Sequence, residues 1–382
     1  MRIGGVQKSL YNLLWSIDTV NEYDVTLLLF SKTGDYADCL PESVKVKECK
    51  GLFRYLGKSQ GEFRSNIIDF LLRAFFAVIS RVISGNFAIN LLLFGEPKIK
   101  DEYDYAISFL HNGRKKAFYG GTQNYVLKKV KAKNKIAFIH GDYCSCGANH
   151  RENNKLLEKF DVIAACSDGC KKILTLAVPD IEHKCVTVRN FNRFDEIKAM
   201  ASENTAEYDS LTVNVVMVAR LSQTKGIDRA IKAISYCIKK DHNVKLHIVG
   251  GGSLKESLQE LAKSEGIEKS VIFYGEQANP YRYMKNADLL LMASYHEAAP
   301  MVIDEAGCLG LPVLSTKTTS TDEMIVDTGS GWVCENSQEA LNEALDAILS
   351  DKKTLADLKS KLSARQTDNS TAEKQFKYII GK

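Results

Sequence analysis

The sequence predicts an α/β protein in which two parallel sheets are each covered by helices on both faces. Short apolar runs bounded by turn residues recur along the 382 residues, and amphipathic helical patterns separate them. Strands that alternate with helices build parallel sheets whose faces are buried. The runs fall into two sets, one in each half of the chain, and 382 residues suffice for two cores. We therefore expect two Rossmann-like domains.

The predicted strands follow the apolar runs in order. In the first half they are VTLLLF, YAISFL, IAFIHG and VIAACS, and in the second VNVVMVAR, KLHIVG, VIFYG, LLLMAS and PVLST. The clearest helix covers 227–238, where isoleucines recur at helical spacing. We expect domains at 1–195 and 196–365, and the polar stretch 202–210 is the predicted linker.

The composition is that of a globular protein, with 45% hydrophobic and 26% charged residues. The given start lacks a basic segment followed by an apolar one, so no signal peptide is predicted. The ten cysteines are therefore interpreted as reduced, cytoplasmic thiols. Cys144, Cys146 and His150, with Cys166 and Cys170 further on, approximate a zinc ligand set. Their spacing is irregular, which favours inert cysteines, and no metal site is predicted.

Positive charge is concentrated in the first half. The net charge is +4, yet residues 51–135 hold fifteen Lys or Arg against six Asp or Glu. This segment surrounds a long apolar stretch that Arg73 and Arg81 interrupt, and the uncharged part, 82–95, is too short to span a bilayer. One interpretation is a helix at an anionic membrane surface. The other is a helix packed on its own sheet, with arginines that reach water. The basic residues are not interleaved with aromatic ones, so nucleic-acid binding is not expected.

Two glutamates eight positions apart mark the most informative segment, SYHEAAPMVIDEAGCLGLPVLST. Residues 287–294 are expected to form a buried strand, Pro300 suits the start of a helix, and Gly310 suits its end. Glu297 then precedes the helix and Glu305 lies within it. A helix start offers free N–H groups and a positive dipole end, and carboxylates accept hydrogen bonds from hydroxyls. The combination suits a sugar phosphate.

Other motifs occur at predicted strand ends. Arg220 and Lys225 follow the strand VNVVMVA, HIVGGGSL ends a strand in glycine, and GGVQKSLYNLL stands at the amino end. His140 ends the strand IAFIHG, where ligands of parallel sheets gather. Each residue alone has an ordinary structural interpretation: Arg220 and Lys225 as surface or capping groups, His140 as a core residue, the glycines as turns.

Together and in this order, these motifs resemble the retaining glycosyltransferases of family 4, which have the GT-B fold. The resemblance implies transfer of a hexose from a nucleotide sugar, in particular a UDP-sugar, to a glycan or polyprenyl-linked acceptor. It implies a bacterial surface polysaccharide pathway, no metal or other cofactor, and a cytoplasmic enzyme. The surface-helix interpretation of the basic first half would place this enzyme on the inner face of the membrane. It also implies that a final helix in 366–382 crosses back to the first domain.

The same resemblance implies roles for individual residues. Glu297 and His140 lie against the transferred hexose, and Glu305 binds the ribose hydroxyls. The other implied contacts are Arg220, Lys225, Met301 and Val302 for the diphosphate, Ala298, Ala299 and Pro300 for the sugar, and Gly4, Gly5 and Gly251 for close backbone approach. The leaving phosphate itself is implied to help deprotonate the acceptor.

One departure from the family keeps an alternative in view. Family members begin with an apolar strand before the glycine loop, but Gly4 here follows only three residues. The first strand is therefore expected to be missing, and a catalytically inactive GT-B-like binding or scaffold protein is the alternative. A nicotinamide-dependent dehydrogenase is disfavoured, because the chain lacks G-x-G-x-x-G after a strand.

Overall fold

The computed structural model describes residues 4–19, 22–34, 36–49 and 51–381. The chain forms two compact units, of which the first comprises Met1–Phe191 with Asn369–Lys382 and the second Asn192–Asp368. Residues 1–3, on which the expectation of a missing first strand falls, lie outside the described residues.

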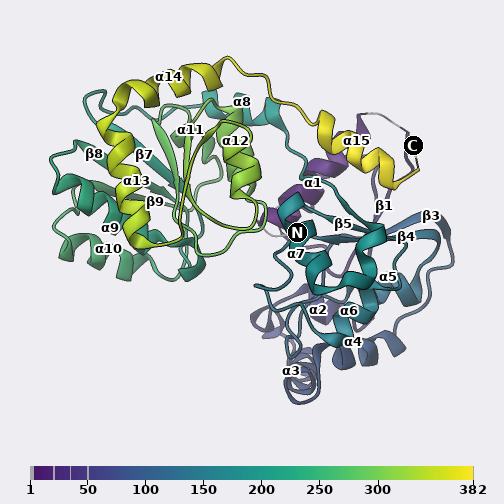
Figure 1. Cartoon of the computed structure of the whole chain (residues 1–382). Helices are drawn as coiled ribbons and strands as arrows, with labels where there is room; N and C mark the ends of the chain where they lie inside the picture. The colour runs from purple at the N-terminus through teal and green to yellow at the C-terminus, as the bar shows by residue number, and fades with distance from the viewer. Residues whose placement is uncertain (1–3, 20–21, 35, 50, 382) are drawn as a thin grey trace. The chain divides into compact units, whose positions relative to one another are not determined.

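The described strands of the first unit form two separate parallel sheets (Figure 1). One pairs β1 (Thr26–Leu29) with β2 (Lys45–Glu48). The other has the order β3-β4-β5-β6. Its strands are β3 (Glu102–Ser108), β4 (Lys131–Ile139), β5 (Val162–Ala165) and β6 (Cys185–Thr187). The four strands predicted for this half are all present, while β2 and β6 were not predicted.

Helices cover both faces of the four-stranded sheet. One face packs on α5 (Thr122–Lys129), α6 (Arg151–Leu157) and α7 (Asp168–Ala177). The other face packs on α1 (Gly5–Asp18) and on α15 (Ser370–Ile379), whose Phe376 lies 6.1 Å from the ring of Phe191. The last helix is therefore part of the first unit's core.

The remaining elements of the first unit gather around a second, aromatic core. They are α2 (Arg54–Gly57), η1 (Gln60–Phe63), α3 (Ile67–Val82) and α4 (Gly85–Phe94). The short helix η2 (Pro179–Lys184), which precedes β6, packs in the core of the four-stranded sheet instead. Phe53, Tyr55 and Phe76 are buried in this core beside Tyr125 of α5. Only the inner side of α3 takes part in it.

The second unit is built on one parallel six-stranded sheet with the order β12-β11-β10-β7-β8-β9. Its strands are β7 (Val213–Val218), β8 (Val244–Val249), β9 (Val271–Gly275), β10 (Leu289–Met292), β11 (Val313–Thr316) and β12 (Gly331–Cys334). From β7 the chain first adds strands on one side, through β8 and β9, and then on the other, from β10 onward. The order therefore reverses between β7 and β10, which is where open parallel sheets form a ligand crevice.

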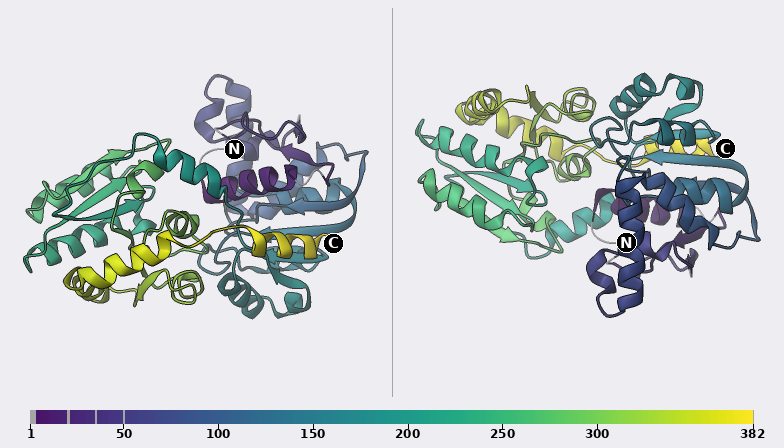
Figure 2. Two further views of the ribbon diagram at one scale, coloured as in Figure 1. Left: turned by 90° about the horizontal axis from the view of Figure 1, so that it is seen from above. Right: turned by 90° about the horizontal axis from the view of Figure 1, so that it is seen from below.

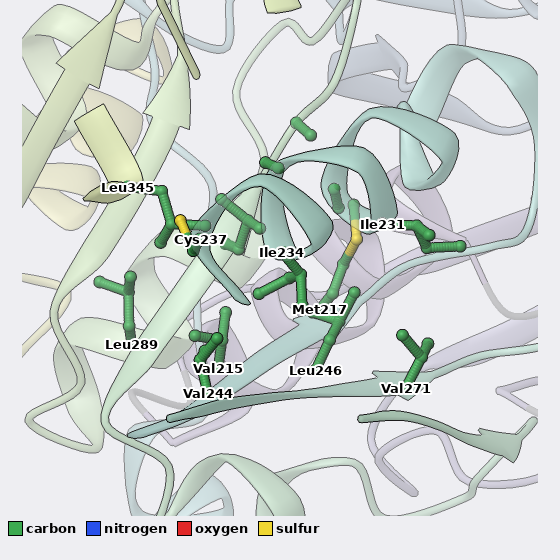
Figure 3. Close-up of a cluster of buried hydrophobic side chains, with 14 of the residues drawn as sticks. Val215, Met217, Ile231, Ile234, Cys237, Val244, Leu246, Val271, Leu289 and Leu345 are labelled. Carbon is green, nitrogen blue, oxygen red and sulfur yellow. The ribbon is translucent and has the colours of Figure 1, made fainter. Parts of the chain in front are cut away.

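Apolar side chains of this sheet alternate between two cores. One face packs on α9 (Ile227–Ile238), α10 (Lys255–Ser264) and α13 (Gln338–Ser350), and the other on α8 (Phe194–Ser202), α11 (Tyr281–Met284) and α12 (Met301–Cys308) (Figure 1). Figure 3 shows Ile231 and Ile234 of α9 directed at the strand residues Met217 and Leu246. Ile227, Ile231 and Ile234 are buried, so the predicted isoleucine stripe is confirmed. The unit is completed by η3 (Gln223–Lys225), η4 (Asp322–Val326) and α14 (Lys352–Ser363).

The predicted linker at 202–210 was wrong. This stretch lies inside the second unit, where the Ala206 amide donates to the carbonyl of Arg282 at 3.0 Å and the Tyr208 hydroxyl to that of Tyr283 at 2.8 Å. The Tyr208 ring also packs against that of His247, tilted by 37° with 4.2 Å between the ring centres. Its polar composition suggested a linker, but a single tyrosine and backbone hydrogen bonds are enough to hold it on the sheet.

No helix among the described residues is both long and apolar enough to cross a membrane. The ten cysteines are free thiols, and no group of His, Cys, Asp or Glu within the described ranges is arranged to hold a metal ion.

Candidate functional site

The loops that follow β7 and β10 are joined where the strand order reverses. The amide of Tyr295, just after β10, donates to the carbonyl of Thr224, in η3, at 2.9 Å. The side chain of Lys225 then donates from Nζ to Oε1 of Glu297. Two residues that are 72 positions apart in sequence are thus brought together at the expected ligand crevice of this sheet.

Gly226 permits this close approach of the two loops. Its φ is +60°, a left-handed conformation that glycine adopts readily. A Cβ at this position would lie 1.9 Å from the carbonyl oxygen of Ala293. No other residue fits between the end of β10 and the start of α9, so the glycine fixes the position of Lys225 relative to Glu297.

The carboxylate of Glu297 is held in place on more than one side. The Ser294 hydroxyl donates to its Oε1 at 3.0 Å, and the amide of Thr319 donates to its backbone carbonyl at 3.3 Å. The Glu297 side chain is only 14% exposed and that of Lys225 27%. An ion pair so shielded from solvent is screened less than a surface pair, and it keeps both groups in a defined geometry.

A buried arginine contacts the loop that follows β10, which carries Glu297. Arg229, in α9, is 3% exposed and donates to Oδ1 of Asn336 at 2.6 Å. Its guanidinium lies 4.7 Å from the ring centre of Tyr295, and Asn336 donates to the Tyr295 carbonyl at 3.2 Å. The sequence did not predict this hydrogen bond, because Arg229 and Asn336 are 107 positions apart.

Helix α12 begins directly after the Glu297 loop, as predicted. Pro300 is its N-cap residue, and Gly310, with φ +69°, follows its end. Within the described part of the chain, the amides of Met301 and Val302 have no hydrogen-bond acceptor. Both therefore point out of the helix start with the positive end of its dipole. Ala298 and Ala299 are half-buried in the loop before them.

Glu305 lies one turn into α12 and is only 5% exposed. The Tyr281 hydroxyl of α11 is 3.5 Å from its Oε1, at the limit of a hydrogen bond. The preceding acid, Asp304, accepts from the Asn192 amide at 3.1 Å. Glu305 therefore lies within α12 and Glu297 in the loop before it, as predicted from their spacing.

Arg220 follows β7 and has an exposed side chain for which the described residues supply no partner. The glycine turn after β8 packs against the same loop. The Leu221 amide donates to the Gly251 carbonyl at 2.8 Å, and a Cβ on Gly252 would lie 2.4 Å from the Leu221 carbonyl. Gly251 itself has an ordinary φ, whereas Gly250 and Gly252 have positive φ and leave no room for a Cβ. The turn fixes the backbone on one side of Arg220.

In the first unit, His140 stands at the end of β4. Its ring stacks on that of Phe138 at 5.6 Å between centres and lies tilted against that of Phe109 at 4.4 Å. The pKa of His140 is lowered to about 3, chiefly by burial and secondarily by the nearby His111, against a hydrogen bond with Asn190 that raises it. The imidazole is therefore neutral near pH 7, and its buried Nε2 has no hydrogen-bond partner among the described residues.

His111 is a neighbour that the sequence did not single out. It follows β3, is 9% exposed, and its Nε2 lies 3.7 Å from Sγ of Cys146. Gly141 makes room for it, since a Cβ there would come within 3.0 Å of the His111 ring. Burial lowers the pKa of His111 to about 4. The signal in the sequence was its place just after the strand YAISFL.

Gly4 and Gly5 stand at the start of α1. Gly4 has an extended backbone, and a Cβ on it would meet only the flexible end of Gln7, at 2.7 Å. No atom lies within 4 Å of the Cβ position of Gly5. Internal packing therefore does not require these glycines, in contrast to Gly226.

The second unit matches a known family model. Residues 209–365 match the model of the family described as glycosyl transferases group 1. The lipopolysaccharide glucosyltransferase WaaG of Escherichia coli is 37% identical over 128 residues, covering 33% of this chain and 34% of the relative. An N-acetylgalactosaminyltransferase of Campylobacter jejuni that acts on a diphospho-undecaprenol saccharide is 27% identical over 231 residues, covering 59% and 62%. The chain thus aligns with about a third to three fifths of these relatives' lengths.

Solved structures extend the likeness to both units. HepE of Anabaena, in complex with UDP and glucose, has a TM-score of 0.67 at 17% identity and covers 99% of this chain and 96% of its own. The structure of WaaG has a TM-score of 0.61 at 18% identity, with 100% and 98% covered. Both coverages include the first unit, whose sequence the family model does not match. Residues 209–365 therefore match the glycosyl transferases group 1 family, and the chain as a whole has the GT-B fold of these solved structures.

Proposed function

We propose that this chain is a retaining hexosyltransferase that transfers a hexose from a UDP-sugar to a glycan or polyprenyl-linked acceptor in bacterial surface polysaccharide synthesis. The observation that carries the proposal is the Lys225 and Glu297 pair at the reversal of strand order, beside the free amides of Met301 and Val302. A fixed cation, a carboxylate and a helix start are the groups that a sugar diphosphate requires. HepE, whose structure holds UDP and glucose, supports the choice of donor.

The residues of the second unit have separate roles in this proposal. Arg220 has an exposed side chain without a partner in the described structure, and its planar fork suits phosphate oxygens. Lys225 adds a point charge, and the amides at the start of α12 add dipoles. Glu305, buried one turn further, accepts from the ribose hydroxyls. Ala298, Ala299 and Pro300 lie along the sugar.

Transfer breaks the bond between the anomeric carbon and the β-phosphate oxygen and forms one to the acceptor oxygen on the same face of the sugar. The electron pair of the broken bond stays with UDP, and the acceptor proton passes to the leaving phosphate. Arg220, Lys225 and the helix start stabilise the charge that develops there, so no divalent ion is needed. Glu297 stabilises positive character at the anomeric carbon. His140 of the first unit, as a neutral imidazole, binds a hydroxyl of the hexose.

The names of two relatives support the choice of acceptor. Lipopolysaccharide is named in the description of WaaG, and a diphospho-undecaprenol saccharide in that of the Campylobacter enzyme. Both are glycans carried on a lipid, which supports an acceptor of that class for this chain.

A donor panel read by release of nucleoside diphosphate, in the presence of chelator, tests the proposal. We expect UDP release from one UDP-hexose and its loss in Lys225→Ala, while Lys263→Ala, an exposed lysine of α10, behaves as wild type. UDP binding without release from any donor would favour the catalytically inactive alternative. Absence of nucleotide binding would contradict the site itself.

A further inference from the structure

The outer sides of α3 and α4 expose an unusual number of large apolar side chains. Eleven of the seventeen exposed large hydrophobic residues of the described structure lie within 67–94. Both views in Figure 2 show α3 projecting at the edge of the first unit. The eleven residues, here called the apolar face, are Ile67, Ile68, Leu71, Leu72, Phe75, Val78, Val82, Ile83, Phe87, Leu91 and Phe94.

The apolar face follows helical spacing. Ile68, Leu71, Phe75, Val78 and Val82 succeed one another by three or four positions along α3, and they are between 56% and 71% exposed. They therefore form one outward stripe. An apolar surface of this extent marks an interaction site rather than scattered exposed residues.

The opposite side of α3 already has its partners. Phe76 and Ser80 are buried, and Arg73 points inward, donating to the carbonyls of Tyr55 at 3.2 Å and Lys58 at 3.0 Å. The packed-helix interpretation expected arginines directed at water, whereas the half-buried Arg73 is directed at backbone carbonyls of its own unit. The outward stripe is a second apolar side that folding of the unit leaves exposed.

Positive charge borders the apolar face. Arg64 and Arg81 are exposed and have no acidic partner among the described residues. Lys115 and Lys116 lie at the start of α4, because the Gly85 amide donates to the Lys115 carbonyl at 2.7 Å.

Negative charge is nearly absent from this segment. The only acid between residues 64 and 95 is Asp69, and its carboxylate accepts from Arg54 at 2.8 Å and from the Tyr55 hydroxyl at 2.7 Å. The apolar face therefore combines hydrophobic side chains with uncompensated positive charge.

The apolar side chains and the bordering positive charge together indicate which kind of partner binds the apolar face. Two copies of the chain packed face to face would bring their own Arg64 and Arg81 toward like charges, which disfavours a self-interface. The helix α3 has 16 residues and does not cross a bilayer. An anionic lipid surface satisfies both features, since acyl chains accept the stripe and headgroups pair with the cations.

We infer that α3 and α4 dock the first unit on an anionic lipid surface, with the apolar face inserted at the boundary of the headgroups. The inference does not depend on the transfer reaction. It places the chain at the surface where a polyprenyl-linked acceptor would be found.

Flotation of the full chain with phosphatidylcholine vesicles, with and without phosphatidylglycerol, tests the inference without donor or acceptor. We expect binding only when phosphatidylglycerol is present, and weaker binding at high salt. Arg64→Gln with Arg81→Gln should weaken it about thirtyfold. Phe75→Ser with Val78→Ser should weaken it about a hundredfold.

The matched control is Leu176→Ser, which removes a side chain that is 73% exposed on α7 of the same unit. It should bind vesicles as wild type does. Thermal unfolding should be alike in all variants, because each altered side chain is exposed. Equal vesicle binding by the Phe75 and Val78 double variant and the control would overturn the inference. So would a wild-type dimer in sedimentation that this double variant converts to monomer, since the apolar face would then bind a second copy.

Discussion

Lys225 and Glu297 form an ion pair that joins the loops after β7 and β10, the two strands between which the sheet order reverses. The pair places opposite charges at the crevice of the second unit before any ligand is present. A donor diphosphate that binds Lys225 would share this cation with Glu297. The ion pair therefore fixes the positions of both charged groups before ligand binds, and each residue can be substituted separately.

Glu297→Gln should separate catalysis from nucleotide binding. The amide keeps the shape of the side chain but loses its negative charge, so stabilisation of the anomeric carbon is lost while Lys225 becomes free for phosphate. We expect the rate of transfer to fall about 10²- to 10³-fold and UDP to bind as tightly as in wild type or more tightly. Turnover and calorimetric titration with UDP measure the two effects. A parallel loss of binding would assign Glu297 a structural role instead.

Arg220→Ala should weaken UDP binding about tenfold or more, because a charge-assisted hydrogen bond contributes about 1.5–3 kcal/mol. Arg220 is exposed and has no partner in the described structure, so its loss should leave the unfolding free energy unchanged. Calorimetry and urea unfolding check both statements. Lys232→Ala, an exposed lysine of α9, is the matched control. Equal affinity in the two variants would exclude Arg220 from the phosphate site.

Glu305→Gln should reduce the preference for UDP over 2′-deoxy-UDP. A carboxylate accepts from two adjacent ribose hydroxyls, whereas an amide offers only one acceptor atom. We expect the ratio of the two dissociation constants to fall about tenfold. Tyr281→Phe removes the hydroxyl that lies 3.5 Å from Glu305 but keeps both carboxylate oxygens, so it should leave that ratio nearly unchanged. An unaltered ratio in Glu305→Gln would contradict the ribose assignment.

Gly226→Ala should destabilise the second unit strongly, and Gly275→Ala should do so only mildly. Both glycines have positive φ, +60° and +73°, but a Cβ would clash with the Ala293 carbonyl at 1.9 Å in one case and meet nothing within 4 Å in the other. The left-handed conformation costs about 1–2 kcal/mol in each, and the clash adds to it only at Gly226. Urea unfolding midpoints compare them. Equal midpoints would show that the two loops can separate at no cost.

The stability of the second unit should decrease in mild acid because of His247. This residue is 3% exposed, and its pKa is lowered to about 4, by burial and then by Lys245, against Asp288, which raises it. Unfolded histidine has a pKa near 6.5. Between these values the unfolded state binds more protons, so the unfolding free energy falls as pH drops below about 6.5 and is constant above.

The slope of this decrease is at most about 1.4 kcal/mol per pH unit for one histidine. His247→Gln should therefore show a shallower loss of unfolding free energy between pH 7 and pH 5 than wild type does. Urea titrations at the two pH values measure it. The same slope in both proteins would mean that His247 does not titrate with unfolding.

The elements of the sheet and the site loops were predictable because their signals are local. Buried parallel strands are continuous apolar runs, and Pro300 and Gly310 mark the two ends of α12. Glu305 could therefore be placed on this helix, and Glu297 in the loop before it, without a structure. The contact between Arg229 and Asn336 could not be predicted, since these residues are 107 positions apart in sequence.

The apolar stretch around α3 shows why the rest required coordinates. Its composition allowed either a packed helix or a surface helix, and α3 has two apolar sides, of which only one is buried. Arg73, which interrupts the stretch, is directed inward to backbone carbonyls, while Arg81 is exposed. Sequence alone does not tell which side of a helix its neighbours will cover.

Titration of the wild-type chain with UDP in the presence of chelator, beside Lys225→Ala, tests the central claim most directly. The account predicts binding without a divalent ion and an affinity at least about tenfold weaker in the variant. Binding that requires a divalent ion, or that is the same in both proteins, would contradict a donor site built from the basic residues and helix start of the second unit.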